Sequence, residues 1–300
     1  MKQIRLLISL PGDSNYLREQ AKAAKTTASR LGLDLQMMNA NSDPITQSQQ
    51  LLGVIQSPSE MRPDGIIVEP VSDSGMSQVA SAAVAAGIAW VISNARVDYI
   101  HALRGTSNVP VFAISQNHDE IGRMLGRQFS ALLPQGGSVL YLRGPSTNSL
   151  ASQRAEGMET ATPPNIHVKT LRADWTAEGA YKSVTSWLRL SSPCAEHTHL
   201  IASQNTDYIP GAKKAFQENT EGEELAKWLS LPITAAGVPS QTKPLVDQGV
   251  LTAAVVTALT MDTAIEMLVR AIRGGSQPSD QVFVPASFYP SLEELAQKKA

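Results

Sequence analysis

The sequence predicts an α/β protein of two lobes, each built on a doubly wound parallel sheet. Short apolar runs typical of buried strands alternate with helical patterns, and 300 residues exceed the usual size of a single domain. The same alternation occurs in both halves of the chain. Polar or aromatic clusters follow many of the apolar runs, and open parallel sheets bind ligands beyond the carboxyl ends of their strands. The pattern therefore indicates a protein that holds a small polar molecule.

The first third of the chain is expected to contain four alternations of strand and helix. The first strand is Ile4–Leu10, and the next helix places apolar and small residues from Leu17 to Leu31 on one face at spacings of three, four and seven. Gly32 follows as a helix-ending glycine. The further strands are predicted at Leu33–Met38, Gly65–Val68 and Ile88–Ile92, with helices near 44–57 and 73–86.

The second half opens with a strand at Val111–Ile114 and a helix that carries apolar residues from Ile121 to Leu133. The later strands are predicted at Ser138–Leu142, Ile166–Leu171, His199–Ala202, Leu229–Ala235 and Thr252–Val256, with helices near 151–161, 176–190, 206–218 and 239–247. A helix over 265–272 that ends at Gly274 and a late strand at Gln281–Val284 have no place in a simple tandem arrangement. The chain is therefore expected to cross between the lobes more than once.

Composition excludes several classes of partner. A net charge of -2 and an isoelectric point near 6.2 give no basic footprint for nucleic acid or anionic lipid. A composition of 42% hydrophobic and 17% charged residues is typical of a soluble globular protein. No apolar run reaches the roughly 18 residues that a transmembrane helix needs, so we expect no membrane insertion.

The cellular compartment is left open by the sequence. Cys194 is the only cysteine, so no intramolecular disulfide can form. The apolar run after Met1 is stopped by Pro11 and Gly12, too early for a signal peptide, and we interpret it as the first strand. The protein is periplasmic if a leader was removed and cytoplasmic if Met1 is the native start.

Motifs for catalysis, cofactors and metals are missing. The sequence has no G-x-G-x-x-G after the first strand, no G-x-x-x-x-G-K and no G-x-S-x-G. His197 and His199 lie on one side of a strand, but no cysteine or acidic partner stands at metal-ligand spacing. His118 precedes two acidic residues in the first turn of a helix. The helix dipole alone explains acidic residues at that place. We expect no catalytic residue, no cofactor and no metal.

Several short motifs follow one another at characteristic spacings. They are Ser9-x6-Tyr16, Ile92-Ser93-Asn94-Ala95-Arg96, Gln116-Asn117-His118-x3-Gly122-x3-Gly126, Arg154-Ala155-Glu156-Gly157, Ala173-Asp174-Trp175 and Ser203-Gln204-Asn205-x5-Gly211-Ala212. Together they resemble the sugar-type periplasmic binding protein family, which includes ribose-binding proteins and the effector domains of lac repressor-like regulators. The resemblance covers almost the whole chain.

The resemblance implies two lobes joined by three crossovers near residues 114, 257 and 282, with the ligand closed between them. The lobes would comprise residues 1–114 with 258–282, and 115–257 with 283–300. The expected ligand-binding residues are Asp13, Asn15, Tyr16, Asn94, Arg96, Asn117, Arg154, Trp175, Asn205 and Thr257. Arginine and asparagine suit neighbouring sugar oxygens, and aromatic rings suit the apolar faces of a sugar.

Other roles for these residues remain open. The alternative role of Asp13 and Asn15 is to cap a helix. The alternative for Arg96 is a surface or hinge ion pair. The alternative for Arg154 is a solvated position on a helix, and the alternative for Trp175 is a position in the core. The sequence also departs from the family at three positions: Ala95 and Gly237 stand where sugar binders carry aspartates, and Thr257 where they carry glutamine.

The expected function is a non-enzymatic solute-binding protein that closes on a carbohydrate or sugar derivative and presents it to an ABC permease. Two alternatives stay open: a cytoplasmic ligand sensor with a signalling partner, and an α/β enzyme that acts in the interlobe cleft. The ligand is a neutral sugar or, because Arg96 and Arg154 remain where two carboxylates are absent, an acidic or phosphorylated derivative.

Overall fold

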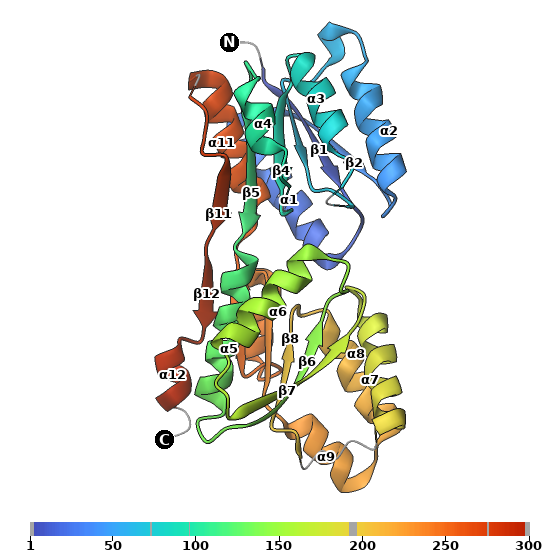
Figure 1. The fold of residues 1–300 in the computed structure, drawn as a ribbon, viewed down its shortest axis with the longest axis vertical. Helices are drawn as coiled ribbons and strands as arrows, with labels where there is room; N and C mark the ends of the chain where they lie inside the picture. The colour runs from blue at the N-terminus through green and yellow to red at the C-terminus, as the bar shows by residue number, and fades with distance from the viewer. Residues whose placement is uncertain (1–2, 73, 96, 192–196, 275, 298–300) are drawn as a thin grey trace. The chain divides into compact units, whose positions relative to one another are not determined.

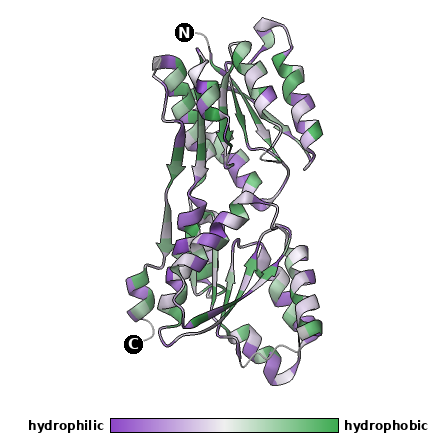
Figure 2. Cartoon of the chain, viewed as in Figure 1, coloured by the Kyte–Doolittle hydropathy of each residue, from purple (hydrophilic) through white to green (hydrophobic). Residues whose placement is uncertain are grey.

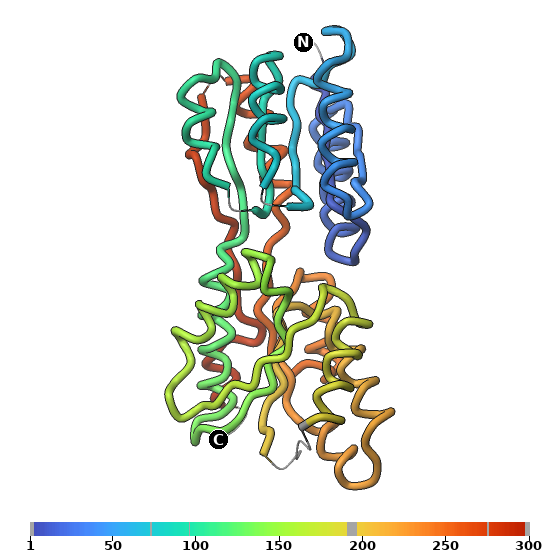
Figure 3. Tube along the Cα trace, turned by 45° about the vertical axis from the view of Figure 1, so that its right-hand side comes forward, coloured from blue at the N-terminus to red at the C-terminus, as the bar shows by residue number. Residues whose placement is uncertain are grey.

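The computed structural model describes residues 3–72, 74–95, 97–191, 197–274 and 276–297. The chain forms two compact units, Met1–Gln116 with Leu259–Val284, and Asn117–Ala258 with Pro285–Ala300. It therefore passes from one unit to the other three times, after residues 116, 258 and 284. In Figure 3 the orange and red segment that follows Leu259 lies among the blue to green segments of the first unit.

The first unit contains a six-stranded parallel sheet in the order β11-β5-β4-β3-β1-β2. Its strands are β1 (Arg5–Leu10), β2 (Asp34–Asn39), β3 (Gly65–Val68), β4 (Ala89–Ser93), β5 (Val111–Gln116) and β11 (Gln281–Val284). The chain enters at β1, turns outward to β2 and returns to β3 on the other side of β1. This reversal of direction between β1 and β3 is the topological switch point of the sheet.

Helices cover both faces of this sheet (Figure 1). They are α1 (Asn15–Leu31), α2 (Pro44–Ile55), α3 (Ser77–Ala85), α4 (Ile100–Gly105) and α11 (Met261–Gly274), with a short 3₁₀ turn at Ser59–Met61. On one face Leu51 of α2, Val79 of α3 and Ile100 of α4 share a core with strand residues such as Trp90. The other face carries α1 and α11, which pack against each other. Because both faces are covered, the inner strands are continuous apolar runs, which Figure 2 shows as green strands.

The second unit repeats the architecture with the order β12-β10-β9-β8-β6-β7. Its strands are β6 (Gly137–Arg143), β7 (Ile166–Arg172), β8 (Leu200–Ser203), β9 (Ile233–Gly237), β10 (Ala253–Thr257) and β12 (Ala286–Tyr289), the last of them antiparallel to β10. Here the chain enters at β6, moves out to β7 and returns to β8, so the switch point lies between β6 and β8. The expected fold class, two doubly wound α/β lobes, is confirmed.

The helices of the second unit also form two layers. They are α5 (His118–Leu132), α6 (Ser149–Ala161), α7 (Ala177–Ser191), α8 (Tyr208–Asn219), α9 (Gly222–Ser230), α10 (Pro239–Asp247) and α12 (Leu292–Gln297). Residues of α5, α6 and α12 share one core with the sheet, and residues of α7, α8 and α9 share the other. No helix in the described ranges is both long and apolar enough to span a bilayer.

Glycines let α5 and α6 approach until their backbones touch. A Cβ atom on Gly122 would lie 2.1 Å from the carbonyl oxygen of Arg154, and one on Gly157 would lie 2.0 Å from that of Asp119. Both distances are far below van der Waals contact, so any side chain at either position would force the helices apart. This approach sets the first turn of α5 beside Arg154 in the middle of α6.

One strand was predicted with the wrong limits. A strand is expected over Leu229–Ala235, but Leu229 belongs to α9 and the strand is Ile233–Gly237. Trp228 explains the difference, because its buried ring stacks on Phe216 with centroids 4.5 Å apart and a helix is what presents it there. The short elements α4, α9, β12 and α12 were also absent from the prediction.

Candidate ligand-binding site

The carboxyl ends of β1 and β3 mark the candidate site of the first unit, and those of β6 and β8 mark that of the second. Each pair flanks the switch point of its sheet, where open α/β sheets bind ligands. Arg96, an expected ligand contact, and Cys194 lie outside the described residues.

Asp13 and Asn15 flank the start of α1 without capping it. Ser14 is the cap, because its hydroxyl accepts a hydrogen bond from the backbone nitrogen of Leu17 at 3.3 Å. Arg18 instead donates to Asp13 Oδ1 at 3.0 Å and to Asn15 Oδ1 at 2.8 Å. Arg18 therefore holds both candidate side chains at the surface, a role that the sequence analysis did not assign to it.

Tyr16 belongs to a polar network that joins three elements of the first unit. Its hydroxyl accepts a hydrogen bond from Gln20 Nε2, which also donates to Thr260 Oγ1 at 3.0 Å. Thr260 Oγ1 lies 2.7 Å from Ser93 Oγ at the end of β4, and Gln20 Oε1 accepts from the backbone nitrogen of Met261 at 3.1 Å. Gln20, Ser93 and Thr260 are fully buried. The half-buried Tyr16 is thereby fixed at the start of α1.

Asn94 and Glu69 lie together at the carboxyl ends of β4 and β3. Asn94 has a φ of 52°, a left-handed conformation that asparagine tolerates, and its Nδ2 donates to Glu69 Oε1 at 3.3 Å. Glu69 is 7% exposed, and burial raises the pKa of its carboxyl to about 8 although the Asn94 hydrogen bond acts to lower it. Glu69 was not among the expected ligand-binding residues. Its signal is an acidic residue directly after a fully apolar strand.

Arg154 of α6 is fixed in the second unit by two acceptors. Its Nε donates to Nδ1 of His118 at 3.1 Å, and its Nη1 donates to the backbone oxygen of Gln204 at 2.5 Å. His118 is 2% exposed, and burial together with the Arg154 charge lowers the pKa of its imidazole well below the usual value. The half-buried Arg154 is thus oriented by the protein rather than freely solvated.

Gln204, which follows β8, joins β6, α6 and the loop after β6. Its Nε2 donates to the hydroxyl of Tyr141 and to the backbone oxygen of Ala151, each at 2.9 Å. Its Oε1 accepts from the backbone nitrogen of Gly144 at 2.9 Å. All of the side chain's polar atoms are used, and the residue is fully buried. Gln204 is a framework residue that sets the position of Arg154.

Trp175 lies after β7 with one face of its ring against Tyr208. The two rings are stacked, with centroids 6.0 Å apart and planes 9° apart. A Cβ atom on Gly144 would come within 2.4 Å of the indole ring, so the ring also covers the loop after β6. Trp175 is half-buried against the core of the second unit. It combines a packing role with a partly exposed aromatic surface.

Three further candidates have clear local roles. Asn117 caps α5, because its Oδ1 accepts from the backbone nitrogen of Glu120 at 3.1 Å. Asn205 Oδ1 accepts from the backbone nitrogen of Tyr208 at 3.1 Å at the start of α8. Thr257 ends β10 and is 2% exposed.

Gly237 stands where an aspartate is common in sugar binders, and its surroundings explain the glycine. A Cβ atom there would lie 3.0 Å from the methyl groups of both Thr206 and Thr242. The two threonines leave no room for a carboxylate unless one of them moves.

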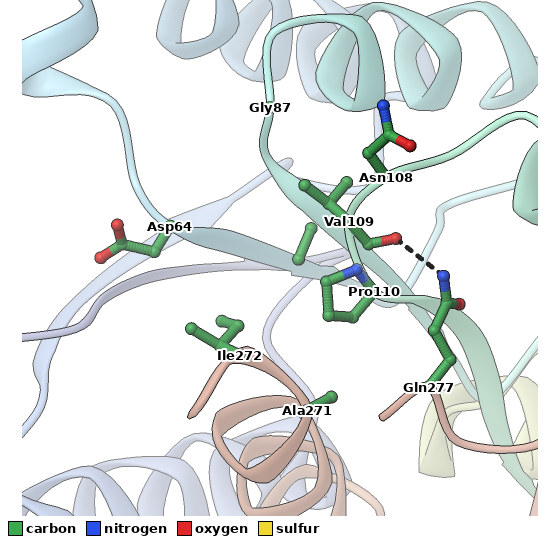
Figure 4. A pocket seen from close by; sticks show the side chains of 9 residues that line it. Asp64, Gly87, Asn108, Val109, Pro110, Ala271, Ile272 and Gln277 are labelled. Atoms are coloured by element: carbon green, nitrogen blue, oxygen red, sulfur yellow. Dashed lines mark hydrogen bonds between the residues drawn. The ribbon is translucent and has the colours of Figure 1, made fainter. Parts of the chain in front are cut away.

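One pocket lies away from the switch points. This pocket of about 310 Å³ in the first unit is lined by residues before its strands, including Asp64, Gly87 and Pro110, and by the end of α11 (Figure 4). Gln277 Nε2 donates to the Val109 carbonyl there at 3.3 Å. The pocket therefore lies at the opposite end of the strands from the candidate site. In the described part of the chain, no group of three or more histidine, cysteine or acidic residues is arranged to hold a metal ion.

A family model described as a periplasmic binding protein domain matches residues 6–276. The chain belongs to the periplasmic binding protein family. The match includes residues of both units of this periplasmic binding protein. No curated protein matches the chain in a sequence search.

Solved structures resemble this periplasmic binding protein over nearly its full length. A galactofuranose binding protein is 20% identical with a TM-score of 0.78, covering 99% of this chain and 98% of its own. A solute binding protein of an ABC transporter from Actinobacillus succinogenes 130z, with bound D-allose, is 18% identical with a TM-score of 0.82, covering 98% and 100%. The fructose binding periplasmic domain of a hybrid two component system is 16% identical with a TM-score of 0.76, covering 99% and 94%.

Proposed function

We propose that this periplasmic binding protein is a non-enzymatic solute-binding protein whose ligand is a carbohydrate or sugar derivative, taken up through an ABC permease. The observation that carries the proposal is the arrangement around Arg154. A guanidinium fixed by His118 and Gln204 lies in the unit that also presents the half-buried Trp175 ring at a strand end. A forked donor and a flat apolar surface are the two kinds of group that a sugar ring requires.

The similar structures support a carbohydrate as the ligand class. Those described above bind galactofuranose, D-allose and fructose, and each covers almost the whole of this chain. The proposed ligand-binding residues are the expected set, namely Asp13, Asn15, Tyr16, Asn94, Arg96, Asn117, Arg154, Trp175, Asn205 and Thr257. Asp13 and Asn15 would act through the oxygens that Arg18 holds in place.

Ligand binding is proposed to work by a shift of population toward a closed form. A solute that contacts both units favours the closed form by its difference in affinity for the two states. The three crossings of the chain are short, so each unit keeps its own core while the crossings bend. We propose residues 1–114 with 258–282 and 115–257 with 283–300 as the moving bodies.

A sensor is the second candidate, because one similar structure is the fructose binding domain of a two component system. The binding step would be the same, and the closed form would signal to a protein partner instead of a permease. An enzyme is disfavoured by the chemistry of the second unit. His118, the titratable group beside Arg154, is buried and uses its Nδ1 to accept from Arg154, which makes it a fixed acceptor rather than a general base.

Thermal shift with a panel of neutral sugars, sugar acids and sugar phosphates tests the proposal. A ligand at one hundred times its Kd stabilises the native state by about 2.7 kcal/mol, which raises the melting temperature by several degrees. Chromatography of the incubated sugars should show no product. Small-angle X-ray scattering should give a smaller radius of gyration for the protein with the bound sugar than for the protein without it. Product formation, or no stabilisation by any member of the panel, would contradict the proposed function.

A further inference from the structure

Glu69 in the first unit and Gln204 in the second occupy equivalent positions. Glu69 directly follows β3, and Gln204 directly follows β8. Each of these strands flanks the switch point of its sheet. The backbone nitrogen of Glu69 donates to the Ser9 carbonyl of β1 at 3.0 Å, and that of Gln204 donates to the Leu142 carbonyl of β6 at 2.9 Å. The same backbone geometry therefore presents both side chains at the carboxyl end of a sheet.

The two side chains differ in how far their polar atoms are satisfied. Gln204 makes three hydrogen bonds through its amide group. Glu69 is similarly buried, but Asn94 bonds only its Oε1, and its Oε2 has no hydrogen-bond partner among the described residues. A buried polar atom without a partner costs about 1–3 kcal/mol. The framework role that Gln204 performs in the second unit does not account for a carboxyl group at the matching position.

The backbone of Glu69 is held firmly enough to aim its side chain. The amide of the buried Gln47 in α2 donates to the Glu69 carbonyl at 2.9 Å and to Ser9 Oγ at 3.1 Å. Pro70 follows and restricts Glu69 to extended conformations. Glu69 therefore carries an unsatisfied carboxyl oxygen on a fixed backbone at a switch point.

The surroundings of Glu69 favour its neutral form. Described titratable groups on the neighbouring elements are Asp13 after β1, Asp43 before α2, Asp98 after β4 and Asp262 in α11. Asp13 pairs with Arg18, and Asp43 accepts hydrogen bonds from Thr46. Asp73 and Arg96, on adjacent loops, lie outside the described residues. No cation of the described ranges forms an ion pair with Glu69, and burial penalises its charged form.

We propose that Glu69 is a ligand-contacting residue of the first unit and that it binds the solute as a neutral carboxylic acid, through its Oε2. In this form the group donates one hydrogen bond to a ligand oxygen and accepts another, which matches a sugar hydroxyl. The inference rests on the proposed function and adds a specificity-determining residue to its site.

Two substitutions separate the neutral acid from the charged form and from a structural role. Glu69→Gln keeps a neutral group that can both donate and accept hydrogen bonds, and Glu69→Met keeps a similar length but removes both abilities. Calorimetry at pH 7 would use the panel sugar that stabilises the wild-type protein most. We expect Glu69→Gln to bind within about threefold of wild type and Glu69→Met to bind at least about tenfold more weakly. Asp64→Asn, at the other end of β3, controls for loss of a carboxyl group and should leave the affinity unchanged.

The outcomes distinguish this inference from the proposed function. If the wild-type protein binds no member of the panel, the proposed function fails and the inference falls with it. If wild type binds and Glu69→Met binds equally well, only the ligand contact is wrong. If both variants lose affinity alike, the charged form is the binding form and the inference is overturned.

A measurement without ligand checks the protonation state independently. In protein labelled at the glutamate carboxyl carbons, the NMR signal that disappears in Glu69→Gln belongs to Glu69. We expect this signal to be that of a protonated acid at pH 6, and an ionised signal at that pH would overturn the inference. Near-ultraviolet circular dichroism of each variant establishes that the fold is retained.

Discussion

Arg154 donates from Nε to Nδ1 of His118, 3.1 Å away across the contact of α6 with α5. The bond requires an unprotonated Nδ1, and burial together with the Arg154 charge lowers the pKa of the imidazole well below its usual value. The histidine is therefore neutral at ordinary pH and acts as a fixed acceptor. Gly122 and Gly157 permit this bond, because only helices in backbone contact bring the two side chains together.

We predict that Arg154→Ala weakens sugar binding by about thirtyfold, since truncation of an anchoring arginine typically costs about 2 kcal/mol. Calorimetry would measure the change. Arg127→Ala is the matched control, because Arg127 lies in α5 and forms an exposed ion pair with Glu120. Its affinity should equal that of wild type. An Arg154→Ala affinity within twofold of wild type would remove Arg154 from the site.

Trp175→Ala should lower both affinity and stability, whereas Trp175→Phe should restore most of the stability. The alanine variant loses the stacking contact with Tyr208 and the cover over Gly144. A phenyl ring keeps part of both. We expect a loss of at least about tenfold in affinity and of roughly 2 kcal/mol in unfolding free energy for the alanine variant, by calorimetry and denaturant titration. An alanine variant that is destabilised but binds like wild type would make Trp175 a core residue only.

The sequence predicted the layers of the fold better than the chemistry of the site. Buried parallel strands are continuous apolar runs, so Gly65–Val68 was predicted with its observed limits. The strand at Leu229–Ala235 was misplaced because a short apolar run does not show whether Trp228 is presented by a helix. Glu69 was missed for a related reason, because its burial and its contacts with Gln47 and Asn94 depend on residues distant in the sequence. Arg18 was missed although its partners, Asp13 and Asn15, lie only five and three residues away, because spacing alone does not show which acceptor a long side chain chooses.

Glu69→Gln should change how the stability of the protein depends on pH. In the native state the Glu69 pKa is about 8, above the ordinary value of 4.5, so the native protein binds more protons between these values and wild type loses stability as pH rises through them. The glutamine variant lacks this loss. Relative to wild type it should be more stable at pH 8.5 than at pH 5, by an amount on the order of 2–4 kcal/mol. Denaturant titrations at the two pH values measure the difference, and an equal difference at both would show an ordinary pKa for Glu69.

Gly157→Ala should destabilise the second unit, while Gly53→Ala in α2 should stabilise the protein slightly. A Cβ at position 157 would lie 2.0 Å from the Asp119 carbonyl oxygen, whereas one at position 53 meets nothing within 4 Å. We expect a loss of about 1–3 kcal/mol for the first and a gain of about 0.4–1 kcal/mol for the second, measured by denaturant unfolding. Because α5 carries His118, Gly157→Ala should also weaken sugar binding. Equal stability of the two variants would contradict the close contact of α5 with α6.

The groups at the two switch points favour a neutral ligand. An unpaired arginine in a closed site favours an anion, but Arg154 already donates to His118 Nδ1 and to the Gln204 carbonyl. Glu69 would approach an anionic ligand as an acid that burial keeps neutral, and it would add no positive charge. We therefore predict that a neutral sugar binds more tightly than its own acid or phosphate. Competition titrations of matched pairs, such as galactose with galacturonate and with galactose 6-phosphate, measure the preference. Tighter binding of either anion, with the preference lost in Arg154→Ala, would show that the guanidinium selects an acidic sugar.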